Sequence, residues 1–166
     1  MKIILIRHGD AGAYTHPDSE RHLSELGKYQ AEQTAHWLTD YGKTYGLPTL
    51  FVSSPYHRAK QTCGIIRQPF IDAFAQIKAP LQIMDNITPN DDAKVALQTL
   101  CDVFGTSESE QMIVVVCHMP IVAKLVALLT GDTPVSYALA EARVIDTPVL
   151  VEGLGKQTDV FIPKQA

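Results

Sequence analysis

The chain has 166 residues, of which 46% are hydrophobic and 19% are charged, and its formal net charge at pH 7 is −4. This composition is typical of a folded globular protein, and the length predicts a single domain over residues 1–166. The acidic balance disfavours general binding to nucleic acid or to an anionic membrane, so an anionic substrate would need a few well-placed arginines.

The three cysteines are Cys63, Cys101 and Cys117. Their number is odd and they are widely spaced, so the sequence predicts neither a disulfide framework nor a thiolate zinc site. A reducing compartment fits this pattern best.

The most apolar stretch, Met112–Leu129, is interrupted by His118, Pro120 and Lys124, which argues against a membrane span. The apolar segment Ile3–Ile6 at the start is too short for the core of a signal peptide. We therefore expect a cytoplasmic protein, and we expect a monomer.

Isoleucine-rich Lys2–Arg7 predicts a buried strand at the start of the chain. A helix is expected next, with Ser24 as its N-cap, Glu25 in its first turn and Gly42 near its end. Leu50–Ser53 predicts a second strand.

Ser54-Pro55 has the pattern of an N-cap followed by proline at the first helical position, so a second helix is expected there. Pro69 is expected to end that helix. The stretch Phe70–Pro89 has mixed character and is interpreted mostly as loop, with one short strand near Gln82–Met84.

In the second half, apolar residues recur at helical spacing from Ala93 to Phe104, and Gly105 is expected to stop that helix. Met112–Cys117 is apolar throughout, as a central parallel strand should be. A helix is expected over Pro120–Thr130, followed by two or three strands within residues 142–162.

This alternation of strands and helices predicts the α/β class, with a mainly parallel sheet covered by helices on both faces. The C-terminal strands follow each other without helices between them, so one edge of the sheet is expected to be antiparallel. The expected architecture is a three-layer αβα sandwich.

Chemically useful residues follow three of the expected strands. The first strand runs into Arg7-His8-Gly9, and the second ends at Ser53 and is followed by Ser54 and Arg58. The strand predicted over Met112–Cys117 ends just before His118. Because ligands bind at the carboxyl ends of strands in open α/β sheets, we expect these side chains to meet at one edge.

These residue types suit an anionic phosphoryl group. Arginine binds phosphoryl oxygens in pairs, and helix starts after Ser54 and Met119 would add backbone N–H donors. A neutral imidazole such as that of His8 is a competent nucleophile near pH 7, and Gly9 lets the backbone pass close to a ligand.

No metal site or cofactor is expected. The remaining histidines show no spacing typical of metal ligands and are interpreted as surface residues; they are His16, His22, His36 and His57.

Together these residues resemble the histidine phosphatase superfamily, which includes the phosphoglycerate mutases. The motifs that carry the resemblance are Arg7-His8-Gly9, Ser53-Ser54-Pro55 with Arg58-Ala59 and Gln61-Thr62, and the later His118. Within the superfamily the chain is similar to the short SixA-type phosphohistidine phosphatases, through Arg7–Ala11, Arg21–Ser24 with Gly27, Ser54–Thr62, Ile87–Pro89 and Cys117–Pro120.

The resemblance implies a phosphoglycerate mutase-like fold and specific roles for the matching residues. His8 would be the residue that is phosphorylated, and Arg7, Arg58 and His118 would surround the phosphoryl group. Arg21 would help to bind phosphate or shape the mouth of the pocket.

One position departs from the SixA-type pattern, which has a glutamate just before its Leu-Thr-Pro stretch. This chain has Asn86 there, with Asp85 beside it. Because losing a general acid costs roughly 10²–10⁴-fold in the cleavage of a phosphoester, the substitution favours phosphohistidine, whose transfer to His8 exchanges one imidazole for another.

The sequence therefore predicts a phosphatase that takes a phosphoryl group from phosphohistidine on a partner protein, an HPt domain or a phosphocarrier, through phospho-His8. Two alternatives stay open. The first is a small-molecule phosphomonoesterase that uses Asp85 or Asp10 as its acid. The second is an inactive phosphate-binding module.

Overall fold

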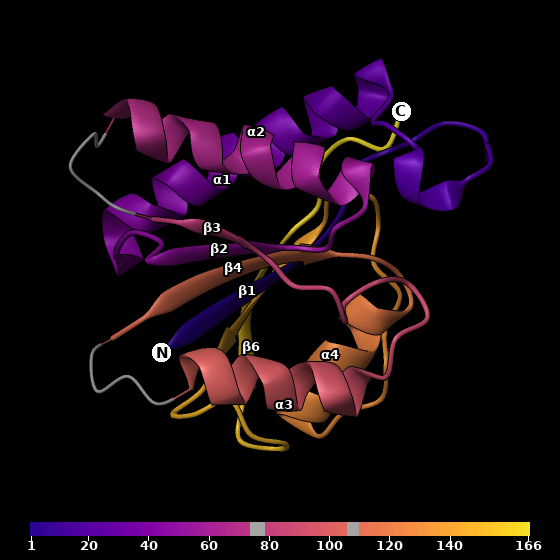
Figure 1. The fold of residues 1–166 in the computed structure, drawn as a ribbon. Coiled ribbons are helices and arrows are strands. Elements are labelled where there is room, and N and C mark those ends of the chain that lie inside the picture. Colours follow the sequence, from indigo (N-terminus) through magenta and orange to yellow (C-terminus); the bar gives the residue numbers. More distant parts are fainter. Residues whose placement is uncertain (74–78, 106–109) are drawn as a thin grey trace.

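The computed structural model describes residues 1–73, 79–105 and 110–166, in which one sheet lies between two layers of helices (Figure 1). The strands are β1 (Lys2–Arg7), β2 (Leu50–Ser53), β3 (Leu81–Ile83), β4 (Met112–Cys117), β5 (Ala142–Asp146) and β6 (Lys156–Phe161). The helices are α1 (Glu25–Tyr45), α2 (His57–Ala73), α3 (Ala93–Phe104) and α4 (Ile121–Thr130), with a 3₁₀ turn η1 at Asp18–Glu20.

The strands of these described ranges form a six-stranded sheet in the order β3-β2-β4-β1-β5-β6. The first four are parallel to one another, whereas β5 and β6 are antiparallel to their neighbours. The expected α/β class, the mainly parallel sheet and the antiparallel edge are thus confirmed.

The two faces of the sheet carry separate apolar cores. Side chains of β4 alternate between them, so that Ile113, Val115 and Cys117 pack with α3 and α4, while Val114 and Val116 pack with α1 and α2. Every residue of β4 is buried, because the strand is central and is covered on both sides (Figure 1).

The register of the central strands aligns the residues that follow them. Arg7 at the end of β1 pairs with Cys117 at the end of β4, and Ser53 at the end of β2 pairs with Val116. The next residue on each strand therefore emerges at the same edge of the sheet.

Two expectations about α2 were wrong. The helix begins at His57 rather than at Ser54-Pro55, and it continues through Pro69 to Ala73. Proline removes one hydrogen bond near the end of the helix, but Phe70 is buried against Phe51 with ring centroids 5.8 Å apart, and this packing holds the last turn in place.

The stretch expected to be mostly loop is therefore partly helical, since residues 70–73 belong to α2. Its short strand is present as β3, one residue earlier than expected, and residues 74–78 lie outside the described part. The other predicted elements agree with the structure to within a few residues at their ends.

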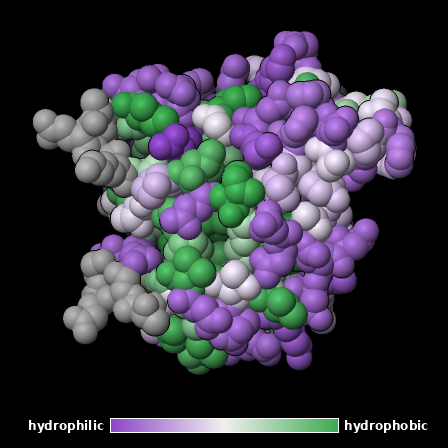
Figure 2. All heavy atoms as spheres, viewed as in Figure 1, coloured by the Kyte–Doolittle hydropathy of each residue, from purple (hydrophilic) through white to green (hydrophobic). Residues whose placement is uncertain are grey.

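Apolar side chains gather near the middle of the face formed by β3 and α3 (Figure 2), where Ile83 and Val103 are exposed.

Within the described ranges, no helix is long and apolar enough to cross a membrane.

Candidate active site

His8 and His118 come together at the carboxyl edge of the sheet, each directly after a central strand. The two rings lie with centroids 5.0 Å apart. The backbone N–H of His8 donates to the carbonyl of Cys117 at 3.0 Å, and that of Ser54 donates to the carbonyl of Val116 at 3.0 Å. The ends of β1, β2 and β4 thus converge as the sequence predicted.

The proton of the His8 ring is placed by a backbone carbonyl. Nδ1 lies 2.7 Å from the carbonyl oxygen of Gly9. A carbonyl oxygen only accepts hydrogen bonds, so Nδ1 carries the proton and Nε2 carries the lone pair. Consistently, the Nε–H of Arg58 donates to Nε2 of His8 at 3.2 Å.

Both histidines are held neutral by their surroundings. The pKa of His8 is lowered to about 3, mainly by burial and in part by the charges of Arg58 and Arg7, while the hydrogen bond to Gly9 opposes the shift. Burial likewise lowers the pKa of His118 to about 2. Nε2 of His8 is therefore a free base over the whole range of ordinary pH.

Arg58 is buried beside His8 and is fixed by a residue that sequence reasoning missed. Its Nη1 donates to the backbone carbonyl of Asp18 at 2.7 Å, and its Nη2 donates to Oδ2 of Asp18 at 3.0 Å. The ring of Tyr56 lies under the guanidinium, 5.1 Å from its carbon. The one signal for Asp18 was its place three residues before Arg21, a spacing that allows an ion pair in a tight turn.

Arg7 is held by a backbone carbonyl rather than by Asp18. Its Nη1 donates to the carbonyl of Tyr137 at 2.8 Å, and its Nε is buried without a hydrogen-bond partner among the described residues. Burial lowers the pKa of Arg7, the positive charge of Arg58 lowers it further, and the carboxylate of Glu141 opposes both. A buried guanidinium with an unused donor is suited to an anionic ligand.

Arg21 makes its side-chain hydrogen bonds to Asp18 and Gly12 rather than to His8. Its Nη1 donates to Oδ1 of Asp18 at 3.0 Å and its Nη2 donates to the carbonyl of Gly12 at 2.9 Å. Tyr14 packs over the guanidinium at 5.4 Å. Arg21 therefore reaches Arg58 through a shared carboxylate.

Gly9 is needed for packing against α1. A Cβ at this position would lie 2.5 Å from the carbonyl oxygen of Gly27, and a Cβ on Gly27 would lie 2.0 Å from that of Asp10. The two glycines bring the loop after β1 against the first turn of α1. The ligand contact predicted for Gly9 remains a prediction.

Ser54 contacts the second histidine instead of capping α2. Its Oγ lies 2.7 Å from Nε2 of His118 and accepts a hydrogen bond from the backbone N–H of Tyr56 at 3.3 Å. The ring of Tyr56 also packs edge-on against His118, with centroids 5.0 Å apart. These contacts fix the His118 ring, whose Nδ1 is buried without a partner among the described residues.

Of the two carboxylates considered as general acids, Asp10 is hydrogen-bonded to other groups and Asp85 lines a separate hollow. Oδ2 of Asp10 accepts from the hydroxyl of Ser24 at 2.5 Å and from the N–H of Gly12 at 3.1 Å. Asp85 and Asn86 line a hollow of about 320 Å³ beside α3, where Nδ2 of Asn86 donates to the hydroxyl of Thr99 at 2.8 Å. This hollow is lined by none of the site residues His8, His118, Arg7 and Arg58.

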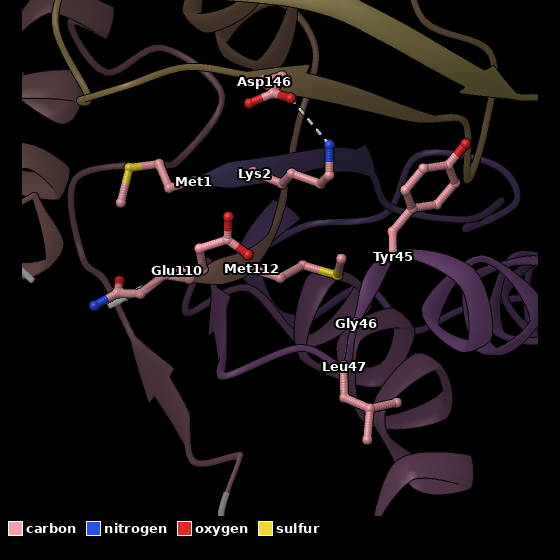
Figure 3. A pocket seen from close by; sticks show the side chains of 9 residues that line it. Met1, Lys2, Tyr45, Gly46, Leu47, Glu110, Met112 and Asp146 are labelled. Atoms are coloured by element: carbon pink, nitrogen blue, oxygen red, sulfur yellow. Dashed lines mark hydrogen bonds and ion pairs between the residues drawn. The ribbon is translucent and has the colours of Figure 1, made fainter. Parts of the chain in front are cut away.

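Another hollow, of about 250 Å³, lies where β1 begins, whereas His8 follows the last residue of that strand (Figure 3). Lys2 and Asp146 form an ion pair of 3.1 Å across one side of it. In the described ranges, no group of three or more histidine, cysteine or acidic residues is arranged to hold a metal ion.

Comparisons with known proteins show the family of the chain. The model of the histidine phosphatase superfamily (branch 1) matches residues 3–81, which include His8, Arg21 and Arg58. The chain is 31% identical over 140 residues to the phosphohistidine phosphatase SixA homolog of Haemophilus influenzae, covering 82% of each protein. It is 30% identical over 138 residues to phosphohistidine phosphatase SixA of Escherichia coli, covering 81% of this chain and 78% of that protein.

Among solved structures, that of the protein histidine phosphatase SixA complexed with tungstate matches with a TM-score of 0.81 and 24% identity, covering 98% of this chain and 97% of that one. This likeness confirms the fold, and the sequence identity to the two curated relatives confirms the family. The chain belongs to the histidine phosphatase superfamily and is a hydrolase of its SixA type.

Proposed function

We propose that the protein removes phosphoryl groups from phosphohistidine on another protein, through a covalent phospho-His8 intermediate. The observation that supports this most directly is the state of the His8 ring. Its proton is held on Nδ1 by the carbonyl of Gly9, so that the lone pair of Nε2 lies in a buried site beside Arg58 and near His118.

In the first step, Nε2 of His8 attacks phosphorus and the bond from phosphorus to the substrate imidazole breaks. The electron pair of that bond leaves with the substrate nitrogen. The Nδ1–H of His8 keeps its bond to the Gly9 carbonyl, which stabilises the positive charge that the ring gains as the new bond forms.

The cations around His8 stabilise the phosphoryl oxygens during transfer. Arg58 and Arg7 supply guanidinium N–H groups for this role. If the hydroxyl of Ser54 donates to Nε2 of His118, the Nδ1 of His118 carries a proton that can donate to a phosphoryl oxygen. Catalysis then consists mostly of positioning and electrostatic stabilisation.

In the second step, water attacks phosphorus and the bond to Nε2 breaks. The electron pair returns to Nε2, both protons of the water stay on the product, and inorganic phosphate leaves as dihydrogen phosphate with the neutral His8 ring restored. The low pKa of His8 supports this step, because a neutral ring is the stable form of the free enzyme.

A phosphohistidine substrate fits the absence of a free carboxylic acid next to His8 in the described part of the chain. Asp10 is bound to Ser24 and Gly12, and Asp85 lies toward α3. Transfer between two imidazoles needs little help from an acid, whereas expulsion of an alkoxide needs a proton. The partner that we propose is an HPt domain or a phosphocarrier protein that bears phosphohistidine.

The test compares phosphate release from a phosphohistidine-bearing carrier protein, a phosphoserine peptide and a sugar phosphate. We expect rapid release from the carrier alone, its loss in His8→Ala, and wild-type rates in His36→Ala, which removes an exposed histidine of α1. A preference for the sugar phosphate or the peptide would contradict the proposal and would favour a phosphomonoesterase. Phosphate binding without release from any of the three would indicate a binding module.

A further inference from the structure

Asp18 lies between Arg58 and Arg21 and contacts both. Its Oδ2 accepts from Nη2 of Arg58 at 3.0 Å, and its Oδ1 accepts from Nη1 of Arg21 at 3.0 Å. Its backbone carbonyl takes a second hydrogen bond from Arg58, at 2.7 Å from Nη1. One residue thus holds two N–H groups of Arg58 and one of Arg21.

The contacts with Asp18 occupy only one edge of the Arg58 guanidinium. The outer edge, formed by Nη1 and Nη2, is held by Asp18, and the Nε–H at the other edge points to Nε2 of His8 at 3.2 Å. A guanidinium has five N–H groups in a rigid plane, so fixing the outer edge fixes the inner one. A phosphoryl group on Nε2 of His8 would meet this inner edge.

Stability alone is an incomplete explanation for Asp18. Its side chain is 30% exposed and that of Arg58 is 5% exposed, so the ion pair does balance a buried charge. The charge of Asp18, however, opposes the binding of an anion beside Arg58 and Arg21. A carboxylate that weakens anion binding at this place is more easily explained if it fixes the orientation of the Arg58 guanidinium.

We propose that Asp18 is a positioning residue, which turns the inner edge of Arg58 toward the phosphoryl group on His8 at the expense of phosphate affinity. This inference rests on the proposed function, since it assigns Asp18 to the same site. Although burial raises the pKa of the Asp18 carboxyl, hydrogen bonds from Arg21 and Arg58 outweigh it and lower the pKa overall, so the residue is ionised near neutral pH.

Positioning and structural support predict opposite changes in phosphate affinity when Asp18 is replaced. If Asp18 positions Arg58, its loss lowers kcat because the guanidinium turns away, yet phosphate binds more tightly because a competing negative charge is gone. If Asp18 only supports the loop, its loss loosens the site, and both kcat and the affinity for phosphate fall.

The experiment compares wild type, Asp18→Ala and the isosteric Asp18→Asn, each also in an Arg58→Ala background, with Glu20→Gln as the control. Glu20 is an exposed acid of the same turn η1. Two quantities are measured: the rate of phosphate release from a phosphohistidine carrier, and the dissociation constant of inorganic phosphate by calorimetry.

We expect Asp18→Ala to lower kcat by about 10- to 100-fold, a loss in the range of other precisely placed groups, and Asp18→Asn to lower it less. Phosphate should bind about two- to tenfold more tightly to both variants. In the Arg58→Ala background the further effect on kcat should fall below about twofold, because a residue that acts through Arg58 has nothing left to position. Glu20→Gln should match wild type.

An equal loss of kcat in both backgrounds, or phosphate binding that does not tighten in Asp18→Asn, would overturn the role of Asp18. The two proposals fail separately. If wild type releases no phosphate from the carrier, the proposed function fails, and the phosphate affinities still test Asp18, since they need no turnover. In that case an affinity that does not rise in Asp18→Asn rejects the positioning role.

Discussion

The Nδ1 of His8 lies 2.7 Å from the carbonyl oxygen of Gly9, the next residue in the chain. This contact is set by the backbone at the end of β1 and does not depend on any other side chain. It places the ring proton away from Arg58 and directs the lone pair of Nε2 toward it. In the proposed mechanism, the nucleophile is therefore prepared before substrate binds.

The protonation state of His8 can be measured directly. The pKa of about 3 predicts that the ¹⁵N resonances of its ring keep the pattern of the neutral Nδ1–H tautomer from pH 8 down to pH 5. The measurement is NMR of protein with ¹⁵N-labelled histidine, with His8→Ala used for assignment. Conversion of His8 to imidazolium with a midpoint near 6.5 would contradict the prediction.

The two buried histidines also predict how stability depends on pH. In the unfolded chain each gains a proton below its ordinary pKa of about 6.5, whereas in the folded protein the pKa values are about 3 and about 2. The free energy of unfolding should therefore be highest above pH 6.5, and each histidine should lower it by about 1.4 kcal/mol per pH unit as pH falls below that.

Urea unfolding at pH values from 7 to 4.5 measures this dependence. In the double variant His8→Asn, His118→Asn the slope should become shallower by about 2.7 kcal/mol per pH unit, twice the effect of one histidine. A slope that is unchanged in the double variant would show that other groups cause the loss of stability in acid.

Gly9→Ala tests the close approach of the first loop to α1. The new Cβ would lie 2.5 Å from the backbone oxygen of Gly27, and backbone cannot easily move away, so a loss of about 1–3 kcal/mol is expected. The matched control is Gly64→Ala within α2, where a Cβ meets nothing within 4 Å and should stabilise the helix by about 1 kcal/mol. Similar effects at both positions, measured by urea unfolding, would rule out the packing argument.

Ser54→Ala tests the support of the second histidine. It removes the hydroxyl that lies 2.7 Å from Nε2 of His118, and we expect about a tenfold lower rate of phosphate release. Ser53→Ala is the control, since the Ser53 hydroxyl donates to the carbonyl of Ser54 at 2.8 Å and the structure gives it no contact with His118. Equal losses of rate in the two variants would argue against a role of Ser54 in holding the ring.

Much of the fold could be predicted because its signals are local. The apolar run Met112–Cys117 and the isoleucines of Lys2–Arg7 mark central strands, and both strands have the predicted bounds. The end of α2 could not be predicted from local signals. Pro69 normally stops a helix, but the burial of Phe70 against β2 outweighs it, and such packing between distant segments is not visible in a local pattern.

The meeting of His8 and His118 was predictable for the same reason as the strands. His8 and His118 each follow a strand directly, so their meeting depends only on the order of the strands in a parallel sheet. Asp18 could not be found in this way, because it lies in a turn whose path over Arg58 depends on the whole loop between β1 and α1. The hydrogen bond of Ser54 to His118 was likewise hidden, since the Ser54-Pro55 pair has the pattern of a helix start.

The central claim is that the phosphoryl group passes through His8, and trapping that intermediate tests it most directly. The protein would be mixed with a ³²P-labelled phosphohistidine carrier, quenched in base within milliseconds and digested. We predict acid-labile, base-stable label on the peptide that contains His8, appearing before free phosphate and absent in His8→Ala. Release of phosphate at the normal rate with no label on that peptide would contradict the account.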